Sequence, residues 1–124
     1  MLAAITAAVF VVLALLHFYW ALRGVSGNSA AIPQINGVPA FRPSKAATAA
    51  VGVALVGTAA IVLMNVQLLI AGAAAVMVLR AIGDFRLVGF FKRPNDSLFA
   101  RMDTRYYSPL CLALGTALAA IAAG

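Results

Sequence analysis

The sequence predicts an all-α protein, a four-helix transmembrane bundle in which residues 1–124 form a single integral membrane domain. Of its 124 residues, 65% are hydrophobic and only 10% are charged, whereas a soluble domain is about half apolar and about a quarter charged. A soluble chain of this size would have too few polar groups to cover its surface. Its apolar runs are long enough to cross lipid, so we expect the lipid bilayer to be its first partner.

The first span is expected over residues 2–22, since about 20 residues at about 1.5 Å each match a hydrocarbon core of about 30 Å. No side chain before His17 is charged, so the basic opening of a signal peptide is missing and the span should be retained. Residues 25–44 contain three prolines along with Gly, Ser and Asn, which exclude a long regular element. Because Ile and Phe are interspersed there, we expect this loop to fold back on the helix ends.

The second and third spans are expected over residues 45–64 and 66–85. Ser44 is placed to cap the second span, and the short connection at Asn65 predicts an antiparallel hairpin. Both spans carry small residues through which a neighbouring backbone could approach closely. In the second span these are Gly52, Ala54, Gly57, Thr58 and Ala60; in the third they are Ala71, Gly72, Ala75 and Val76.

Residues 86–107 are less regular. Asp96 or Ser97 could cap a short helix in which Leu98, Phe99, Met102 and Tyr106 recur at helical spacing, and such a helix would lie at the membrane interface. The last span is expected over residues 107–124, with Ser108 as N-cap and Pro109 in the first turn. About 16 residues give only about 24 Å. This span must therefore thin the bilayer, pack behind the others, or begin earlier, near Arg105.

The net charge of +6 belongs to residues that flank the apolar runs. We therefore assign it to membrane topology and expect no nucleic-acid partner. Every Lys and Arg lies in the first or third loop or at the adjoining helix ends, while the two termini and the turn at Asn65 carry no charged side chain. By the positive-inside rule, the basic loops should face the cytoplasm of a bacterial inner membrane, with both termini outside.

The charged pair that first suggests a site is Arg80 and Asp84, which stand one helical turn apart and would share a face. Two interpretations stay open: a structural ion pair, or a site for an anionic or polar headgroup in which Asp84 holds Arg80. Arg86, Tyr19 and Trp20 complete the candidate ligand-binding set. Tyr19 and Trp20 also suit a simpler role, as anchors at the membrane interface. Asp103 could pair locally with Arg101 or Arg105.

His17 is the only histidine, and with Asp84 it forms the candidate catalytic pair. The two would meet if the first and third helices pack together, and a His–Asp pair can move protons near neutral pH. A hydrogen-bonded packing residue is the more common role for a lone histidine. We expect no metal site, because there is no second histidine and Cys111 is isolated. The pattern leaves any cofactor unknown.

Several motifs resemble a family of small bacterial integral membrane proteins classed as a domain of unknown function. The resemblance lies in His17-Phe18-Tyr19-Trp20, in Gly83-Asp84-Phe85-Arg86-x-x-Gly89-Phe90-Phe91-Lys92, in Phe99-Ala100-x-x-Asp103 and in Tyr107-Ser108-Pro109. It would cover nearly the whole chain, although Arg23 stands where a smaller residue is expected. It implies a four-helix inner-membrane protein and no particular activity.

Two classes of function follow. In the first, the protein is a non-enzymatic module that binds a lipid or amphiphile, or an accessory subunit of a homo-oligomer or larger membrane complex. In the second, it is a membrane-embedded enzyme acting on a lipophilic substrate, with His17 as acid/base and Arg80 as anion clamp. The two differ in whether His17 faces Asp84.

Overall fold

The described part of the chain is helical apart from one small hairpin. The computed structural model describes residues 1–23, 31–36, 38–41, 44–93 and 97–124. In chain order the elements are α1 (Leu2–Arg23), β1 (Gln34–Ile35), β2 (Val38–Pro39), α2 (Lys45–Leu63), α3 (Gln67–Ile82), α4 (Leu98–Met102), a π-helical turn η1 (Asp103–Tyr107) and α5 (Ser108–Ala123). The all-α prediction is confirmed, and α1, α2 and α5 end within one residue of the predicted bounds.

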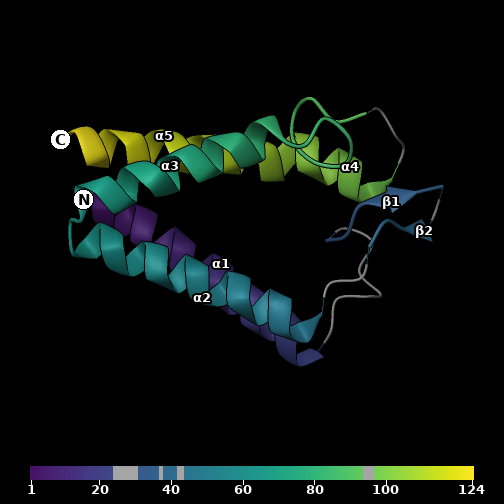
Figure 1. The fold of residues 1–124 in the computed structure, drawn as a ribbon, viewed down its shortest axis with the longest axis horizontal. Coiled ribbons are helices and arrows are strands. Elements are labelled where there is room, and N and C mark those ends of the chain that lie inside the picture. Colours follow the sequence, from purple (N-terminus) through teal and green to yellow (C-terminus); the bar gives the residue numbers. More distant parts are fainter. Residues whose placement is uncertain (24–30, 37, 42–43, 94–96) are drawn as a thin grey trace.

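The helices form two antiparallel pairs, α1 with α2 and α3 with α5, which meet at one end and diverge toward the other (Figure 1). Helices α1 and α3 do not pack along each other, although the His17–Asp84 hypothesis required it. The turn after α2 reverses the chain at Asn65, which adopts a left-handed φ of 57°. Beyond this turn α3 leaves α2 and packs on α5, so the predicted hairpin holds only at its tip.

A glycine allows close approach of the helices in each pair, but not every glycine predicted to lie at such a contact does so. A Cβ on Gly52 would lie 2.7 Å from the Phe18 ring, so α1 and α2 approach closely there. On α5, a Cβ on Gly115 would lie 2.8 Å from Val78. The small residues predicted to form the contact ridge of α3 are exposed, and no atom lies within 4 Å of the position that a Cβ on Gly72 would take. Ala74 and Val78 form the contact with Gly115 instead.

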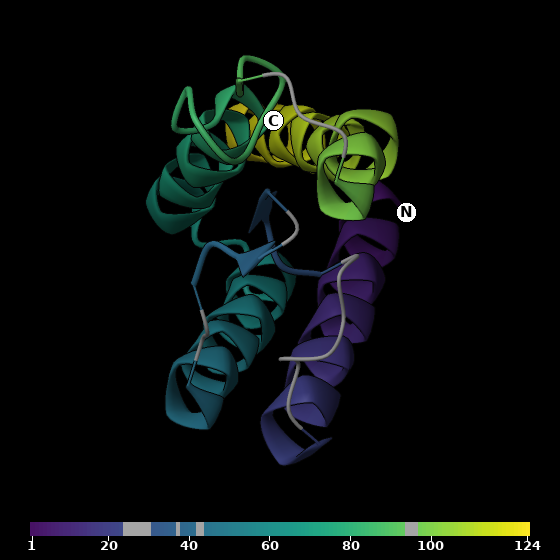
Figure 2. The same cartoon turned by 90° about the vertical axis from the view of Figure 1, so that its right-hand side faces the viewer.

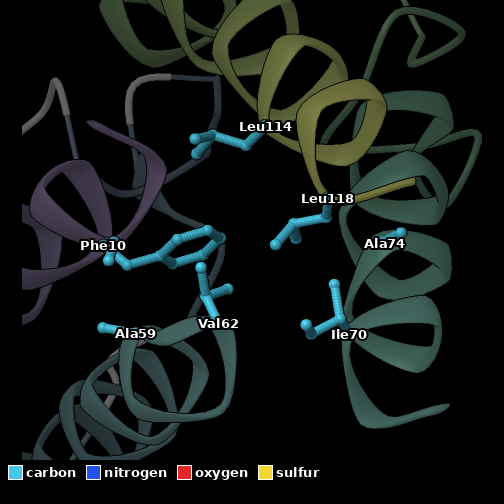
Figure 3. Close-up of a cluster of buried hydrophobic side chains, with 8 residues drawn as sticks. Phe10, Ala59, Val62, Ile70, Ala74, Leu114 and Leu118 are labelled. Carbon is cyan, nitrogen blue, oxygen red and sulfur yellow. The ribbon is translucent and has the colours of Figure 1, made fainter. Parts of the chain in front are cut away.

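The hydrophobic core lies at the closed end, where the four helices come together (Figure 3). Phe10 from α1 points toward Val62 from α2, and Leu118 from α5 lies opposite Ile70 from α3. All four side chains are at most 2% exposed. Burying each large apolar side chain contributes roughly 1.5–3 kcal/mol relative to water, and less where lipid is the alternative. This cluster holds the two helix pairs together.

The open end is occupied by the β1–β2 hairpin, which lies between the diverging helix pairs (Figures 1 and 2). Gln34 pairs with Pro39, and Ile35 pairs with Val38. Ile32, just before the hairpin, is 1% exposed. The expectation that this loop folds back on the helix ends is therefore confirmed for its described residues; residues 24–30, 37 and 42–43 lie outside them.

The last helix begins earlier than the predicted span, because α4, η1 and α5 are continuous from Leu98 to Ala123. Ser97 caps it by accepting a hydrogen bond from the Ala100 N–H at 3.1 Å, whereas Asp96 lies outside the described residues. Ser108 is not an N-cap. It lies inside the helix, and its N–H donates to the carbonyl of Asp103, one wide turn back. The backbone widens just ahead of Pro109, which cannot donate and whose ring crowds the preceding turn.

Three described helices are long and apolar enough to cross a membrane: Leu2–Arg23, Lys45–Leu63 and Leu98–Ala123. Helix α3 is apolar but has only 16 residues, about 24 Å. Large apolar side chains such as Val12, Leu15 and Leu68 are more than half exposed. This is expected when lipid, not water, covers the surface. The helices mark the chain as a membrane protein.

Candidate functional site

The site is built by the loop of residues 83–93, which folds back over the end of α3. Gly83 ends the helix with φ of 90°, and Gly89 takes φ of 88°. The two glycines lie back to back: a Cβ on Gly89 would come 2.4 Å from the Cα of Gly83. The Phe90 N–H then donates to the Ala81 carbonyl at 2.7 Å, which satisfies a free carbonyl of the last helical turn. Only glycine fits at both positions.

Asp84 stabilises this loop from within and does not pair with Arg80. Its Oδ1 accepts hydrogen bonds from the backbone N–H groups of Arg86 at 2.9 Å, Leu87 at 2.8 Å and Val88 at 3.2 Å. The bonds from Leu87 and Arg86 hold the pKa of the Asp84 carboxyl below its usual value. The predicted Arg80–Asp84 ion pair is wrong, because the helix ends at Ile82 and Asp84 leaves its face.

The partner of Arg80 is Asp103, which is 0% exposed. Arg80 Nη2 lies 2.7 Å from Asp103 Oδ1, and Lys92 Nζ lies 3.1 Å from Oδ2. The Gly89 N–H also donates to Oδ2, at 2.7 Å. Asp103 therefore ties α3, the glycine loop and the last helix together. The expected local pairing with Arg101 or Arg105 is wrong.

Two polar atoms near this cluster are buried without a hydrogen-bond partner in the described part of the chain: Arg80 Nη1 and Ser108 Oγ. Ser108 follows the π-helical turn that Asp103 begins. Buried polar groups are usually satisfied, and an exception deserves an explanation. The π-helical turn accounts for the Ser108 N–H, which donates to the Asp103 carbonyl, but it supplies no partner for the hydroxyl.

A basic groove opens on the outer side of the Asp103 cluster. It has a volume of about 550 Å³ and is lined by Phe90, Lys92, Arg93, Ala100, Arg101, Thr104 and Arg105. Lys92 Nζ lies against the Thr104 hydroxyl and also donates to the Gly89 carbonyl at 3.1 Å. The Arg105 guanidinium sits 5.6 Å from the centre of the Tyr106 ring, a distance that suits a cation–π contact. Four cationic side chains thus share one groove.

The other predicted site residues do not join this groove. His17 and Trp20 line a different cavity, between α1 and α2, and their rings are 5.2 Å apart in an edge-on arrangement. Tyr19 is 58% exposed. The Arg86 side chain is exposed too, and its backbone serves the turn at Asp84. Of the predicted set, Arg80 alone belongs to the Asp103 cluster.

Sequence reasoning missed Asp103 as the centre of the cluster, and it assigned Lys92, Arg101 and Arg105 to membrane topology and the attraction of anionic lipid. One signal was present in the sequence. Asp103 follows Phe99 by one helical turn and is next to Met102, both apolar, and a residue in that position is expected to be partly buried. A buried carboxylate needs a cationic partner. The spacing does not identify Arg80 on α3 and Lys92 in the preceding loop as the partners of Asp103.

The fold and the site define a class: a membrane protein of apolar helices whose described charged side chains lie toward one end of the molecule. The chain belongs to the family described as "Protein of unknown function (DUF3995)", whose model matches residues 10–118. No curated protein and no solved structure matches it. The expected membership in a family of unknown function is confirmed.

Proposed function

We propose that this protein binds the headgroup of an anionic phospholipid in the basic groove, as a non-enzymatic membrane module. The observation that carries the proposal is that Arg93, Arg101 and Arg105 line one groove together with the Thr104 hydroxyl. The Lys92 ammonium lines the same groove but is already held by Asp103, the Gly89 carbonyl and Thr104. Phosphate oxygens are suited to such a set, since Arg and Lys donate charge-assisted hydrogen bonds and a hydroxyl adds a neutral donor.

The charge balance of the groove favours an anion. Among the described residues, the carboxylate that contacts a lining side chain is Asp103, which is 0% exposed and already has two cationic partners, Arg80 and Lys92. Arg101 and Arg105 are exposed, and no described carboxylate pairs with either of them. Basic residues near a membrane surface attract anionic lipid by about 1 kcal/mol each.

The proposal includes an orientation. The described basic residues lie at the open end of the molecule, and both termini lie at the closed end (Figure 1). The positive-inside rule then supports cytoplasmic basic loops and external termini in a bacterial inner membrane. Anionic lipids on the cytoplasmic side would be available to the groove in that orientation. A homo-oligomer or a larger complex stays a prediction.

The enzyme hypothesis receives no comparable support. It needed His17 and Asp84 to face each other, with Arg80 as a clamp. His17 belongs to the α1–α2 cavity, Asp84 binds backbone N–H groups of its own loop, and Arg80 is engaged by Asp103. We therefore favour binding over catalysis.

The test is native mass spectrometry of the protein in detergent with equal amounts of phosphatidylglycerol and phosphatidylcholine. The wild type should retain phosphatidylglycerol preferentially. The double variant Arg101→Gln/Arg105→Gln should bind it more weakly by about 2 kcal/mol, on the order of 30-fold. The matched control is Arg23→Gln/Lys45→Gln, which removes the same charge from the α1–α2 pair, outside the groove.

Equal losses in the two double variants would mean that net charge alone governs lipid retention, and would contradict a site. Competition by inorganic phosphate at the lipid concentration would identify a free anion as the ligand and contradict the lipid. Preferential loss in the groove variant, with no competition by phosphate, is the expected result.

A further inference from the structure

A second cavity lies between α1, α2 and the segments that flank the β hairpin. It has a volume of about 200 Å³ and is lined by His17, Trp20, Ala31, Ile32, Phe41, Ala47, Thr48 and Val51. Part of its wall is closely packed, because Ile32 is 1% exposed and α1 meets α2 closely where Gly52 touches Phe18. The cavity shares no lining residue with the basic groove.

The hydrogen bonds of the lining define what a ligand would meet there. His17 Nδ1 lies 2.7 Å from the Leu13 carbonyl oxygen. A carbonyl only accepts, so Nδ1 is the donor, and the neutral tautomer with this proton has its lone pair on Nε2. The Thr48 hydroxyl donates to the Ser44 carbonyl at 2.9 Å, and an indole N–H can only donate. Of the nitrogens in the described lining side chains, His17 Nε2 is the one able to accept a hydrogen bond.

We infer that this cavity is a binding site for a single-ring apolar molecule that carries one hydroxyl group, the chemistry of a simple phenol. The hydroxyl would donate to His17 Nε2, and the ring would pack against Trp20 and Phe41. A cavity of about 150 Å³ lined by apolar side chains holds benzene, so about 200 Å³ suits one substituted ring. The rest of the described lining is mostly apolar, which disfavours ligands with several polar groups.

Trp20 makes the inference directly testable, because it is the only tryptophan in the chain. A heavy-atom quencher bound in the cavity lies in contact with the indole. The purified protein in detergent is titrated with 4-bromophenol and, in parallel, with 4-bromoanisole, whose methoxy group cannot donate. We expect a saturable loss of Trp20 fluorescence with the phenol, above the linear quenching that both compounds give by dissolving in the micelle.

Variants distinguish binding of the quencher in the cavity from its general partitioning into the micelle. His17→Leu removes the ring acceptor, while the oxygen of the Thr48 hydroxyl is kept, and should weaken phenol binding about two- to tenfold, the range for one hydrogen bond. Val51→Phe enlarges a lining side chain and leaves residue 17 unchanged, and it should abolish the saturable phase by taking up space in the cavity. The matched control is Val53→Phe on the same helix, since Val53 is 63% exposed and outside the lining. It should behave like the wild type.

The inference is overturned if 4-bromoanisole saturates at the same concentration as the phenol, because the hydroxyl then contributes nothing. It is also overturned if Val51→Phe leaves the saturable phase intact, because the quencher then binds elsewhere. Should His17→Leu fail to fold, the two valine variants and the pair of quenchers still decide the question.

Discussion

Arg80 on α3 donates to Asp103 on the last helix at 2.7 Å, across 23 residues of sequence. Lys92 and the Gly89 N–H occupy the second carboxylate oxygen. One buried acidic side chain therefore fixes the glycine loop against two helices, and it positions the groove in which Lys92, Arg101 and Arg105 lie. The cluster is a structural support for the groove.

Asp103→Asn should destabilise the protein strongly, because it leaves Arg80 and Lys92 without their counter-ion. Removing one partner of a buried pair costs about 3–5 kcal/mol. Arg80 is 31% exposed, so solvent reduces the loss and we expect about 2–3 kcal/mol. Thermal unfolding in detergent, followed by circular dichroism, measures it. Asp84→Asn is the control: its amide oxygen can still accept the backbone N–H groups, and an equal loss would contradict the assigned pairing.

Acidification should weaken the loop through Asp84. Its pKa is depressed in the folded protein by the N–H groups of Leu87 and Arg86. A depressed pKa contributes stability above the ordinary aspartate value of 3.8, and the contribution is lost as the pH falls through the folded-state value. The stability difference between wild type and Asp84→Asn should therefore shrink as the pH drops below about 4. A difference that stays constant over that range would argue against ionised Asp84 as the cap.

Helix positions could be predicted from the sequence because their signals are local. Apolar runs, the Ser44 cap and the breaks at glycine and proline are each read within a few residues. The prediction failed at the end of α3, where it continued the helix to residue 85. Gly83 ends it with a left-handed φ, and that single difference moves Asp84 off the face of Arg80.

Pairing between helices could not be predicted. Helices α1 and α2 are apolar on every side, so no polar stripe marks the face that packs. The assumption that α1 meets α3 placed His17 beside Asp84, whereas α1 packs on α2 and His17 lines their shared cavity. Long-range contacts such as Arg80–Asp103 depend on which helices pack together, and that arrangement cannot be inferred from a single sequence.

Gly89→Ala should be among the most damaging substitutions of a small residue. The new Cβ would lie 2.4 Å from the Ile82 carbonyl oxygen, in a backbone that already has a φ of 88°. We expect a loss of about 2–4 kcal/mol, combining steric overlap with backbone strain. Thermal unfolding of the variant beside Gly72→Ala measures it. Nothing lies within 4 Å of a Cβ at Gly72, so that control should be neutral or slightly stabilising. Equal losses would contradict the back-to-back contact of Gly83 and Gly89.

Ser108→Ala should leave the protein as stable as the wild type or raise its stability by up to about 1 kcal/mol. The Ser108 hydroxyl is buried and has no partner among the described residues, and leaving such a group unsatisfied costs about 1–3 kcal/mol. The control on the same helix is Thr116→Ala, whose exposed hydroxyl donates to the Leu112 carbonyl at 2.9 Å. Unfolding in detergent compares the two. A loss above about 1 kcal/mol in Ser108→Ala would mean that the hydroxyl does have a partner, such as an ordered water shared with Arg80 Nη1.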